Sequence, residues 1–246
     1  MSKNKKILIK RLFSHLEGVV VIPTFLVVYN FDIIKKIKTQ KSLSLSQLSN
    51  NESTQAGYLN VALTTLSSLN ILKKIIRNNE VYYNLTDYGS KYIKSIEGYF
   101  LYTKVEPLIN KFIVNDIKKN DIQLYIKSLN QLMDNLEKNL KKLFESKNII
   151  EERIAHHIEG ALLAPLLIYN SHNPGNQEME IIIKKILSFD SNLDIEEAYN
   201  YFYLRSKSYG VTASYQPIFS SLDKIIFKGK NPTDYRDDNN NELHVN

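Results

Sequence analysis

Glycine and proline are scarce in this chain, and that scarcity constrains the fold more than any other feature. The 246 residues include only 8 Gly and 6 Pro, the two residue types that disfavour a helix interior most strongly. Apolar residues recur instead at spacings of three and four over long stretches, which is the period of one helix face. The sequence therefore predicts a mostly α-helical fold in which one small β-hairpin is the exception.

The first hundred residues contain an ordered series of short elements. Their patterns predict helices over 3–15 and 17–38, a helical turn over 46–50 and a longer helix over 55–71. The longer helix has an apolar stripe that would lie on one buried face, formed by Leu59, Ala62, Leu66 and Leu69.

A hairpin and a capped helix are expected next. Two strand-like runs, 74–76 and 81–85, flank the turn Arg77–Glu80, whose two Asn residues tolerate the positive φ of a tight hairpin. Thr86 is the expected cap of a helix over 87–96, because its hydroxyl accepts from free amides of a first turn. The order helix, short helix, longer helix, hairpin is typical of a winged helix-turn-helix.

Longer helices dominate after residue 100. Seven apolar residues follow the spacing of three heptads, which suits packing in a core or against a partner helix, and core packing is favoured. They are Ile122, Ile126, Leu129, Met133, Leu136, Leu140 and Leu143. Further helices are expected over 148–169, 178–187 and 195–208. We recognise no internal repeat at a fixed period.

Several classes of protein are disfavoured by composition. The chain has no Cys, which excludes disulfides, zinc–thiolate sites and a thiol nucleophile. The basic N-terminus is followed by charged residues rather than by the apolar core of a signal peptide. The longest apolar run, 19–29, is about half of the roughly 20 residues that span a bilayer. We therefore expect a cytoplasmic protein that does not enter a membrane.

One short segment carries a family resemblance. Val81-Tyr-Tyr-Asn-Leu-Thr-Asp-Tyr-Gly-Ser-Lys-Tyr92 resembles the end of the winged-helix dimerisation domain of O-methyltransferases. In that domain a strand reading aromatic-x-Leu-Thr runs into a helix that begins acidic-x-Gly. DNA-binding winged helices end similarly, so this segment alone does not distinguish the two classes.

The second half narrows the resemblance. Three segments occur in order: Ala155-His-His-Ile-Glu-Gly-Ala-Leu-Leu-Ala-Pro165, then Tyr209-Gly-Val-Thr-Ala-Ser-Tyr-Gln-Pro-Ile-Phe219, then Glu242-Leu-His-Val-Asn246. They resemble the region before the catalytic core in C-methyltransferase domains of modular polyketide synthases, including the apratoxin-type starter-unit methyltransferases. The resemblance implies a winged helix-turn-helix domain over 1–100, a helical lid over 101–230 and a linker over 231–246 toward a catalytic domain.

The cofactor of that family is S-adenosylmethionine (SAM), which we do not expect this chain to bind. A Rossmann-type SAM site needs clustered glycines after a strand, and no two of the eight glycines here lie within five residues of each other. The chain is then a fragment, a shortened product or one piece of a split enzyme. The partners implied by the resemblance are a SAM-binding catalytic domain or subunit and an acyl carrier protein, and a homodimer is also considered.

Nucleic acid is not an expected partner, although the net charge is +6. The helix that would enter a major groove should carry cationic or amide side chains, yet residues 50–70 contain no Lys or Arg. Packing or dimerisation through the winged helix is favoured. The alternatives are a winged-helix transcription regulator with a helical dimerisation or effector domain, and a helical interaction protein without any catalytic link.

Six residues are candidates for facing a substrate: His156, His157, Tyr209, Ser214, Tyr215 and Gln216. We expect their two segments to converge into one wall of a substrate cavity, because such walls mix polar and apolar groups. The alternative is that both segments pack separately and that the histidines are structural. No residue of the chain is assigned as catalytic, as cofactor-binding or as a metal ligand.

Overall fold

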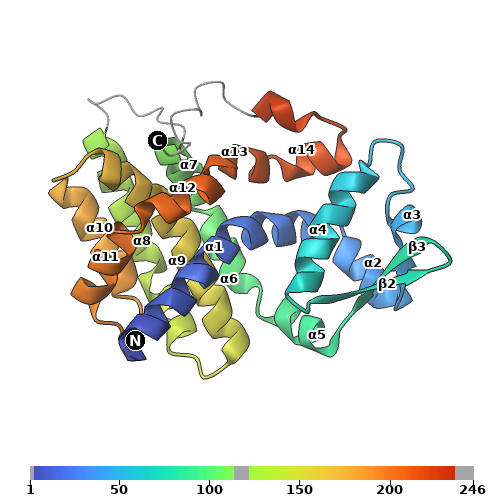
Figure 1. Ribbon diagram of the computed structural model, residues 1–246, viewed down its shortest axis with the longest axis horizontal. Coiled ribbons are helices and arrows are strands. Elements are labelled where there is room, and N and C mark those ends of the chain that lie inside the picture. Colours follow the sequence, from blue (N-terminus) through green and yellow to red (C-terminus); the bar gives the residue numbers. More distant parts are fainter. Residues whose placement is uncertain (1–2, 114–121, 236–246) are drawn as a thin grey trace. The chain divides into compact units, whose positions relative to one another are not determined.

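The computed structural model describes residues 3–113 and 122–235. The described chain is mostly α-helical with one small three-stranded antiparallel sheet (Figure 1), which confirms the predicted fold class. It divides into two compact units that interleave along the sequence. Among the described residues, the first unit contains 3–20, 97–113 and 122–216, and the second contains Val21–Ile96 and 217–235.

The first unit is a helical layer around α9 (Ile149–His172). This helix packs against α6 (Glu97–Thr103), α7 (Glu106–Ile113), α8 (Ile122–Phe144), α10 (Gln177–Leu187) and α12 (Ser206–Ser214). The helix α11 (Ile195–Tyr203) packs beside α10. Nearly the whole central part of α9 is buried, which explains why its sequence from Ala161 to Ile168 is entirely apolar.

The heptad stripe of α8 lies in this core, as favoured from the sequence. Its buried members are Ile126, Leu129, Met133, Leu136 and Leu140, and Phe144 extends them by one turn. The helix packs on α9 and α10, so its apolar face contacts other helices of the same chain.

The second unit combines short helices with the sheet. Its elements are the end of α1 (Lys3–Asn30), α2 (Ile33–Gln40), β1 (Leu43–Ser44), α3 (Leu45–Leu48), α4 (Ala56–Ser68), β2 (Leu72–Arg77), β3 (Glu80–Leu85), α5 (Asp87–Lys94), α13 (Gln216–Phe219), α14 (Leu222–Phe227) and a 3₁₀ turn (Pro232–Tyr235). The strand order is β1-β3-β2. The helix and hairpin order agrees with the sequence prediction, and β1 is an additional short strand paired with β3.

Local sequence explains the hairpin and the helix after it. Asn78 and Asn79 both have positive φ, 49° and 61°, as the two central residues of a type I′ turn require. The hydroxyl of Thr86 accepts a hydrogen bond from the Gly89 amide at 2.8 Å, which confirms the predicted cap. The four stripe residues of α4 are buried, at exposures of 6% or less.

The N-terminal helix differs from the prediction. We expected a break near residues 15–17, but α1 is continuous from Lys3 to Asn30. The chain turns only at Asp32, where φ is 60°. Gly18 is a poor helix former, but it is accommodated inside α1, where it lies against the backbone of α9 at His157.

This continuity also affects the domain boundaries. The first 20 residues belong to the unit that contains α9, whereas the expected domains divide the chain at residues 100 and 230. The expected linker over 231–246 falls largely outside the described residues, as does the resembling segment 242–246.

By length and composition alone, the part of α1 from Asn4 to Asn30 could cross a membrane. Its most apolar stretch has a mean hydropathy of 1.7, but 61% of that stretch is buried inside the protein. Such burial is typical of a core helix, and α1 also buries Arg11 and His15 together with their partners.

Candidate functional site

A buried polar cluster joins α1, α9 and α12 in the first unit. The Arg11 guanidinium donates to both carboxylate oxygens of Glu159, at 2.6 and 2.7 Å, and to Asp190 at 2.6 Å. The His15 ring contacts Glu159 through Nε2 at 2.7 Å and the Tyr209 hydroxyl through Nδ1 at 2.8 Å. Arg11, His15 and Glu159 are at most 3% exposed, so these charges interact in a medium that screens them weakly.

The hydrogen-bond partners of His15 indicate which of its ring nitrogens carries the proton. An ionised carboxylate only accepts hydrogen bonds, so Nε2 of His15 carries the proton and donates it to Glu159. Nδ1 then accepts from the Tyr209 hydroxyl. A neutral imidazole satisfies both contacts.

Electrostatics supports that assignment. Burial lowers the pKa of His15, and the hydrogen bond from the ring to Glu159 offsets this only in part. Burial alone would raise the pKa of Glu159, but the charge of Arg11 and the hydrogen bonds of His15 and Arg11 lower it to about 2. At pH 7 the cluster therefore contains a neutral His15 between the Tyr209 hydroxyl and the Glu159 carboxylate.

A second cluster joins the same two helices. His157 on α9 contacts the Tyr99 hydroxyl through Nδ1 at 2.6 Å and Glu17 on α1 through Nε2 at 3.4 Å. Arg153 donates to the same Glu17 oxygen at 3.0 Å. His157 is fully buried, whereas the side chains of Glu17 and Arg153 are 42% and 30% exposed.

The two clusters are built from two copies of one sequence pattern. The segments 7–23 and 149–165 both read Ile-x3-Arg-x3-His-x-Glu-Gly-x4-Pro, in the same register throughout. The identical pairs are Ile7 and Ile149, Arg11 and Arg153, His15 and His157, Glu17 and Glu159, Gly18 and Gly160, and Pro23 and Pro165. Each helix donates its Arg and His to the Glu of the other helix. Two identical subunits related by a two-fold axis contact each other in the same reciprocal way. Here the two matching surfaces belong to one chain.

The repeated glycines explain how the helices come so close. A Cβ on Gly160 would lie 2.1 Å from the His15 Cα, and one on Gly18 would lie 2.2 Å from the His157 carbonyl oxygen. Each glycine therefore lies against the backbone at the histidine of the other copy. We call this arrangement the α1–α9 clasp, formed by the Arg, His, Glu and Gly of both copies.

Adding one methyl group at this contact should be costly. We expect Gly160→Ala to lower the free energy of unfolding by about 2–3 kcal/mol, because the clash is with backbone that cannot rotate away. The matched control is Gly57→Ala in α4, where a Cβ would meet nothing within 4 Å. That change should stabilise the protein by roughly 0.5–1 kcal/mol. Urea unfolding of the three proteins measures both effects, and equal stability of the two variants would contradict this account of the clasp.

The clasp was not predicted, although its signal is present in the sequence. A single duplication has no fixed period, so it is not found as a periodic repeat. The sequence also offers the histidines of this helix a nearby carboxylate on the same helix, Glu152, so their contact with α1 is not evident from local spacing. Aligning 7–23 with 149–165 reveals the two copies directly.

The six substrate-facing candidates are placed as follows. The helices α9 and α12, which carry most of them, pack directly against each other. Tyr209 pairs with His15 rather than with His156 or His157, and His156 lies near the Phe144 ring at 5.8 Å. Ser214 donates to the Val211 carbonyl, and Gln216 donates to the Tyr102 hydroxyl. Tyr215 is 38% exposed, and the expectation that these residues face a substrate stays a prediction.

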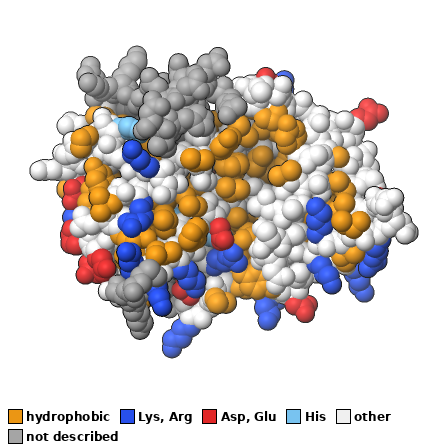
Figure 2. Space-filling model, in the orientation of Figure 1, with side chains coloured by type: hydrophobic (Ala, Val, Ile, Leu, Met, Phe, Trp, Pro, Cys, Tyr) orange, Lys and Arg blue, Asp and Glu red, His pale blue; other side chains and the backbone are white. Residues whose placement is uncertain are grey.

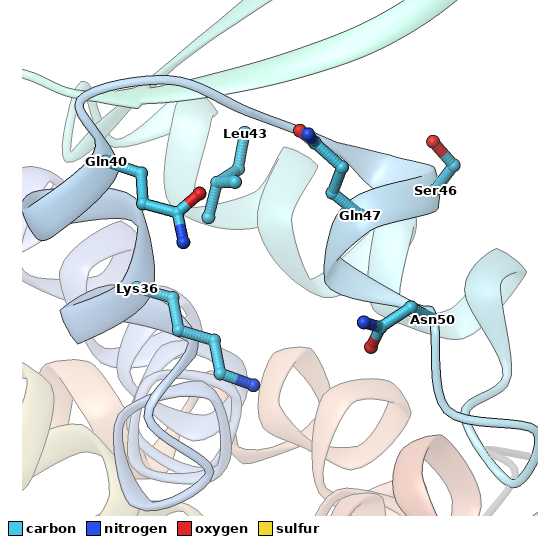
Figure 3. A pocket seen from close by; sticks show the side chains of 6 residues that line it. All are labelled: Lys36, Gln40, Leu43, Ser46, Gln47 and Asn50. Atoms are coloured by element: carbon cyan, nitrogen blue, oxygen red, sulfur yellow. The ribbon is translucent and has the colours of Figure 1, made fainter.

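A pocket of about 520 Å³ lies in the second unit. Its lining residues come from α2, β1, α3 and the segment that follows α3: Lys36, Gln40, Leu43, Ser46, Gln47 and Asn50 (Figure 3). None of the six candidates is among them. Over the described ranges, no group of three or more His, Asp or Glu side chains is arranged to hold a metal ion.

The comparison with known proteins gives one result for the N-terminal part. Residues 8–74 match the family model of the AprA N-terminal domain. The match covers about a quarter of the chain, and includes most of α1 and the elements as far as β2. The first copy of the repeated pattern, from Arg11 to Pro23, lies within it. No curated protein matches the chain.

Proposed function

We propose that this chain is the N-terminal, lid-forming part of a SAM-dependent methyltransferase that acts on a carrier-bound acyl substrate in polyketide synthesis. The observation that carries the proposal is the match of residues 8–74 to the AprA N-terminal domain. The motifs of the second half support it by their resemblance to the same class of enzyme. The chain supplies no SAM site of its own, and its partners are a SAM-binding domain or subunit and an acyl carrier protein.

The second unit supports the winged-helix part of the proposal. Its elements follow the order α2, β1, α3, α4, β2, β3, with β1 paired to the hairpin. A helix, a short strand, two helices and a two-stranded wing are the parts expected of a winged helix-turn-helix. In the proposed enzyme this unit serves packing or dimerisation, and the helical layer around α9 forms the lid.

A winged-helix transcription regulator is the second candidate. The observation in its favour is the same element order, since DNA-binding domains share it. The exposed face of α4 argues against it, because Tyr58 and Val61 are 44% and 64% exposed there and no Lys or Arg lies between residues 50 and 70. A groove-reading helix normally combines base contacts with phosphate contacts.

A complementation assay tests the proposed function. The chain is mixed with the isolated SAM-binding core of an apratoxin-type methyltransferase, and labelled methyl transfer from SAM to an acyl-loaded carrier protein is measured. We expect transfer to rise severalfold when the chain is added. The variant Gly160→Ala, which weakens the clasp, should give a smaller rise than Gly57→Ala. No rise at any concentration of the chain would contradict the assignment as a lid.

The chain alone should not bind SAM. The reason is the absence of clustered glycines that would let a backbone approach the cofactor. Isothermal titration of the chain with SAM should give only heats of dilution. Saturable binding at micromolar concentration would show that the SAM site lies in this chain. It would contradict the proposal that SAM binds to a separate domain or subunit.

The chain should also not bind DNA specifically. Phosphate contacts supply most of the affinity of DNA-binding proteins, and α4 offers no cation for them. In a gel-shift assay at physiological salt with excess competitor DNA, we expect no retained complex. A complex that survives those conditions would favour the regulator over the methyltransferase component.

A further inference from the structure

The net positive charge of the described residues lies mostly in the second unit. Over those residues the second unit has 12 Lys and Arg against 6 Asp and Glu, a net charge of +6, whereas the first has 17 against 15, a net charge of +2. The lysines of α2, the hairpin and α5 are mostly exposed. Figure 2 shows basic side chains at the lower right of the face drawn, and also at its lower left. A field of one sign attracts oppositely charged ligands, so the second unit favours an anion.

The pocket in this unit offers hydrogen-bond donors that the described residues do not use. Lys36 has no ion pair with any of them, whereas its neighbour Lys35 lies 3.7 Å from Asp32. The side-chain amides of Gln40 and Asn50 likewise have no hydrogen-bond partner within ranges 3–113 and 122–235. One ammonium and two amides are therefore available for a ligand.

The geometry brings these groups together. Figure 3 shows Lys36 and Asn50 pointing toward each other across the gap between α2 and α3, with the Gln40 amide entering the same space. Buried Leu43 forms an apolar part of the wall. Gln47 is held in place because its Oε1 accepts from the Ser44 amide at 2.9 Å. None of the six lining residues is a carboxylate, although one of them, Ser46, donates a hydrogen bond to Glu80, so one carboxylate adjoins the pocket at its Ser46 end, away from Lys36 and Gln40 in Figure 3.

We propose that this pocket binds the phosphate group of a small phosphorylated molecule. A phosphate presents several oxygen acceptors around one centre, which matches an ammonium and two amide donors that approach from different sides. The volume of about 520 Å³ exceeds that of a phosphate alone and lies within the range of small-molecule sites. The amide oxygens of Gln40 and Asn50 remain as acceptors for hydroxyl groups of the same ligand.

A small molecule fits better than a nucleic acid. The helix that would enter a major groove, α4, carries no Lys or Arg, which disfavours a duplex as the ligand. The proposal is independent of the methyltransferase assignment, because the pocket lies in one unit and involves no part of the clasp.

Titration with inorganic phosphate and with glycerol 3-phosphate tests the site, with chloride at equal ionic strength as the control. In two-dimensional NMR spectra, the side-chain amide signals of Gln40 and Asn50 should shift and saturate at millimolar phosphate. Lys36→Gln should weaken binding about tenfold, whereas Lys38→Gln should change it by less than about twofold. Lys38 is the matched control because it lies on the same helix, is exposed, and does not line the pocket.

Three results would overturn the proposal. The first is an absence of saturable shifts at Gln40 and Asn50. The second is equal weakening by Lys36→Gln and Lys38→Gln, which would mean diffuse attraction to a basic surface. The third is a DNA duplex that displaces glycerol 3-phosphate from the pocket at physiological salt, which would assign the pocket to a nucleic-acid backbone.

Discussion

Replacing Glu159 by Gln is expected to lower the free energy of unfolding by at least about 3 kcal/mol, because breaking one partner of a buried ion pair costs roughly 3–5 kcal/mol. The side chain is 1% exposed and holds two partners, Arg11 and His15. The substitution leaves the buried guanidinium with Asp190 as its remaining carboxylate. Urea unfolding followed by circular dichroism measures the change.

The second copy of the pattern provides a matched control. Glu17 occupies the equivalent position and also holds an Arg and a His, but its side chain is 42% exposed. Water screens and replaces these contacts, so Glu17→Gln should cost about 1 kcal/mol or less. If the two substitutions cost the same, burial does not set the strength of the clasp and this description of it is wrong.

Much of the fold could be predicted because its signals are local. The stripe of α4, the Asn-Asn turn and the cap at Thr86 each depend on residues within a few positions of one another. The continuity of α1 could not be predicted in this way. Its Gly18 is explained by the backbone of His157, which lies in the other half of the sequence. A close contact between two helices far apart in the sequence leaves no local pattern from which a continuous helix could be predicted.

The side-chain contacts of the candidate site could not be predicted, for the same reason. The helices α9 and α12, which carry His157 and Tyr209, pack together. The partners of these two residues are His15, Glu17 and Tyr99, which come from elements distant in the sequence and are therefore indicated by no local pattern. That the six candidates face a substrate stays a prediction. The pocket around Lys36 was not predicted, because its lining residues follow no recognisable sequence motif. They come together only where the chain turns from α2 to α3.

Acidification from pH 7 to pH 5 is expected to destabilise the protein. Burial lowers the pKa of His15, His156 and His157 below the ordinary value of 6.5, and that of His156 to about 4. Below pH 6.5 the unfolded chain therefore binds a proton at His156 that the folded chain does not, which lowers the free energy of unfolding by about 1.4 kcal/mol per pH unit. His156 alone accounts for about 2 kcal/mol at pH 5, and His15 and His157 act in the same direction. The loss is large beside the total stability of a domain, which is only about 5–15 kcal/mol.

The carboxylates of the clasp extend the loss to lower pH. The pKa of Glu17 is lowered by its hydrogen bond with His157 and by Arg153, and that of Glu159 by Arg11 and His15, each to about 2. Because their unfolded value is 4.5, the stability they contribute above that pH is lost as the pH falls toward 2. Glu159 contributes most of it, since Glu17 is 42% exposed and water screens its contacts. Acid unfolding should thus begin with the histidines and be complete before these two carboxylates are fully protonated.

Replacing one histidine, His156, distinguishes the effect of the neutral histidines from a general sensitivity of the protein to acid. The His156 ring lies beside Phe144, and its side chain has no hydrogen bond or ion pair within the described residues. Gln at this position therefore removes one titrating group without breaking a polar contact. His156→Gln should lower the midpoint pH of acid unfolding and reduce the proton uptake by about one, as measured by circular dichroism and by pH-stat titration. Exposed His172 is the control, since the same substitution there leaves the buried groups unchanged. A midpoint that moves equally in both variants would show that buried neutral histidines do not cause the acid sensitivity.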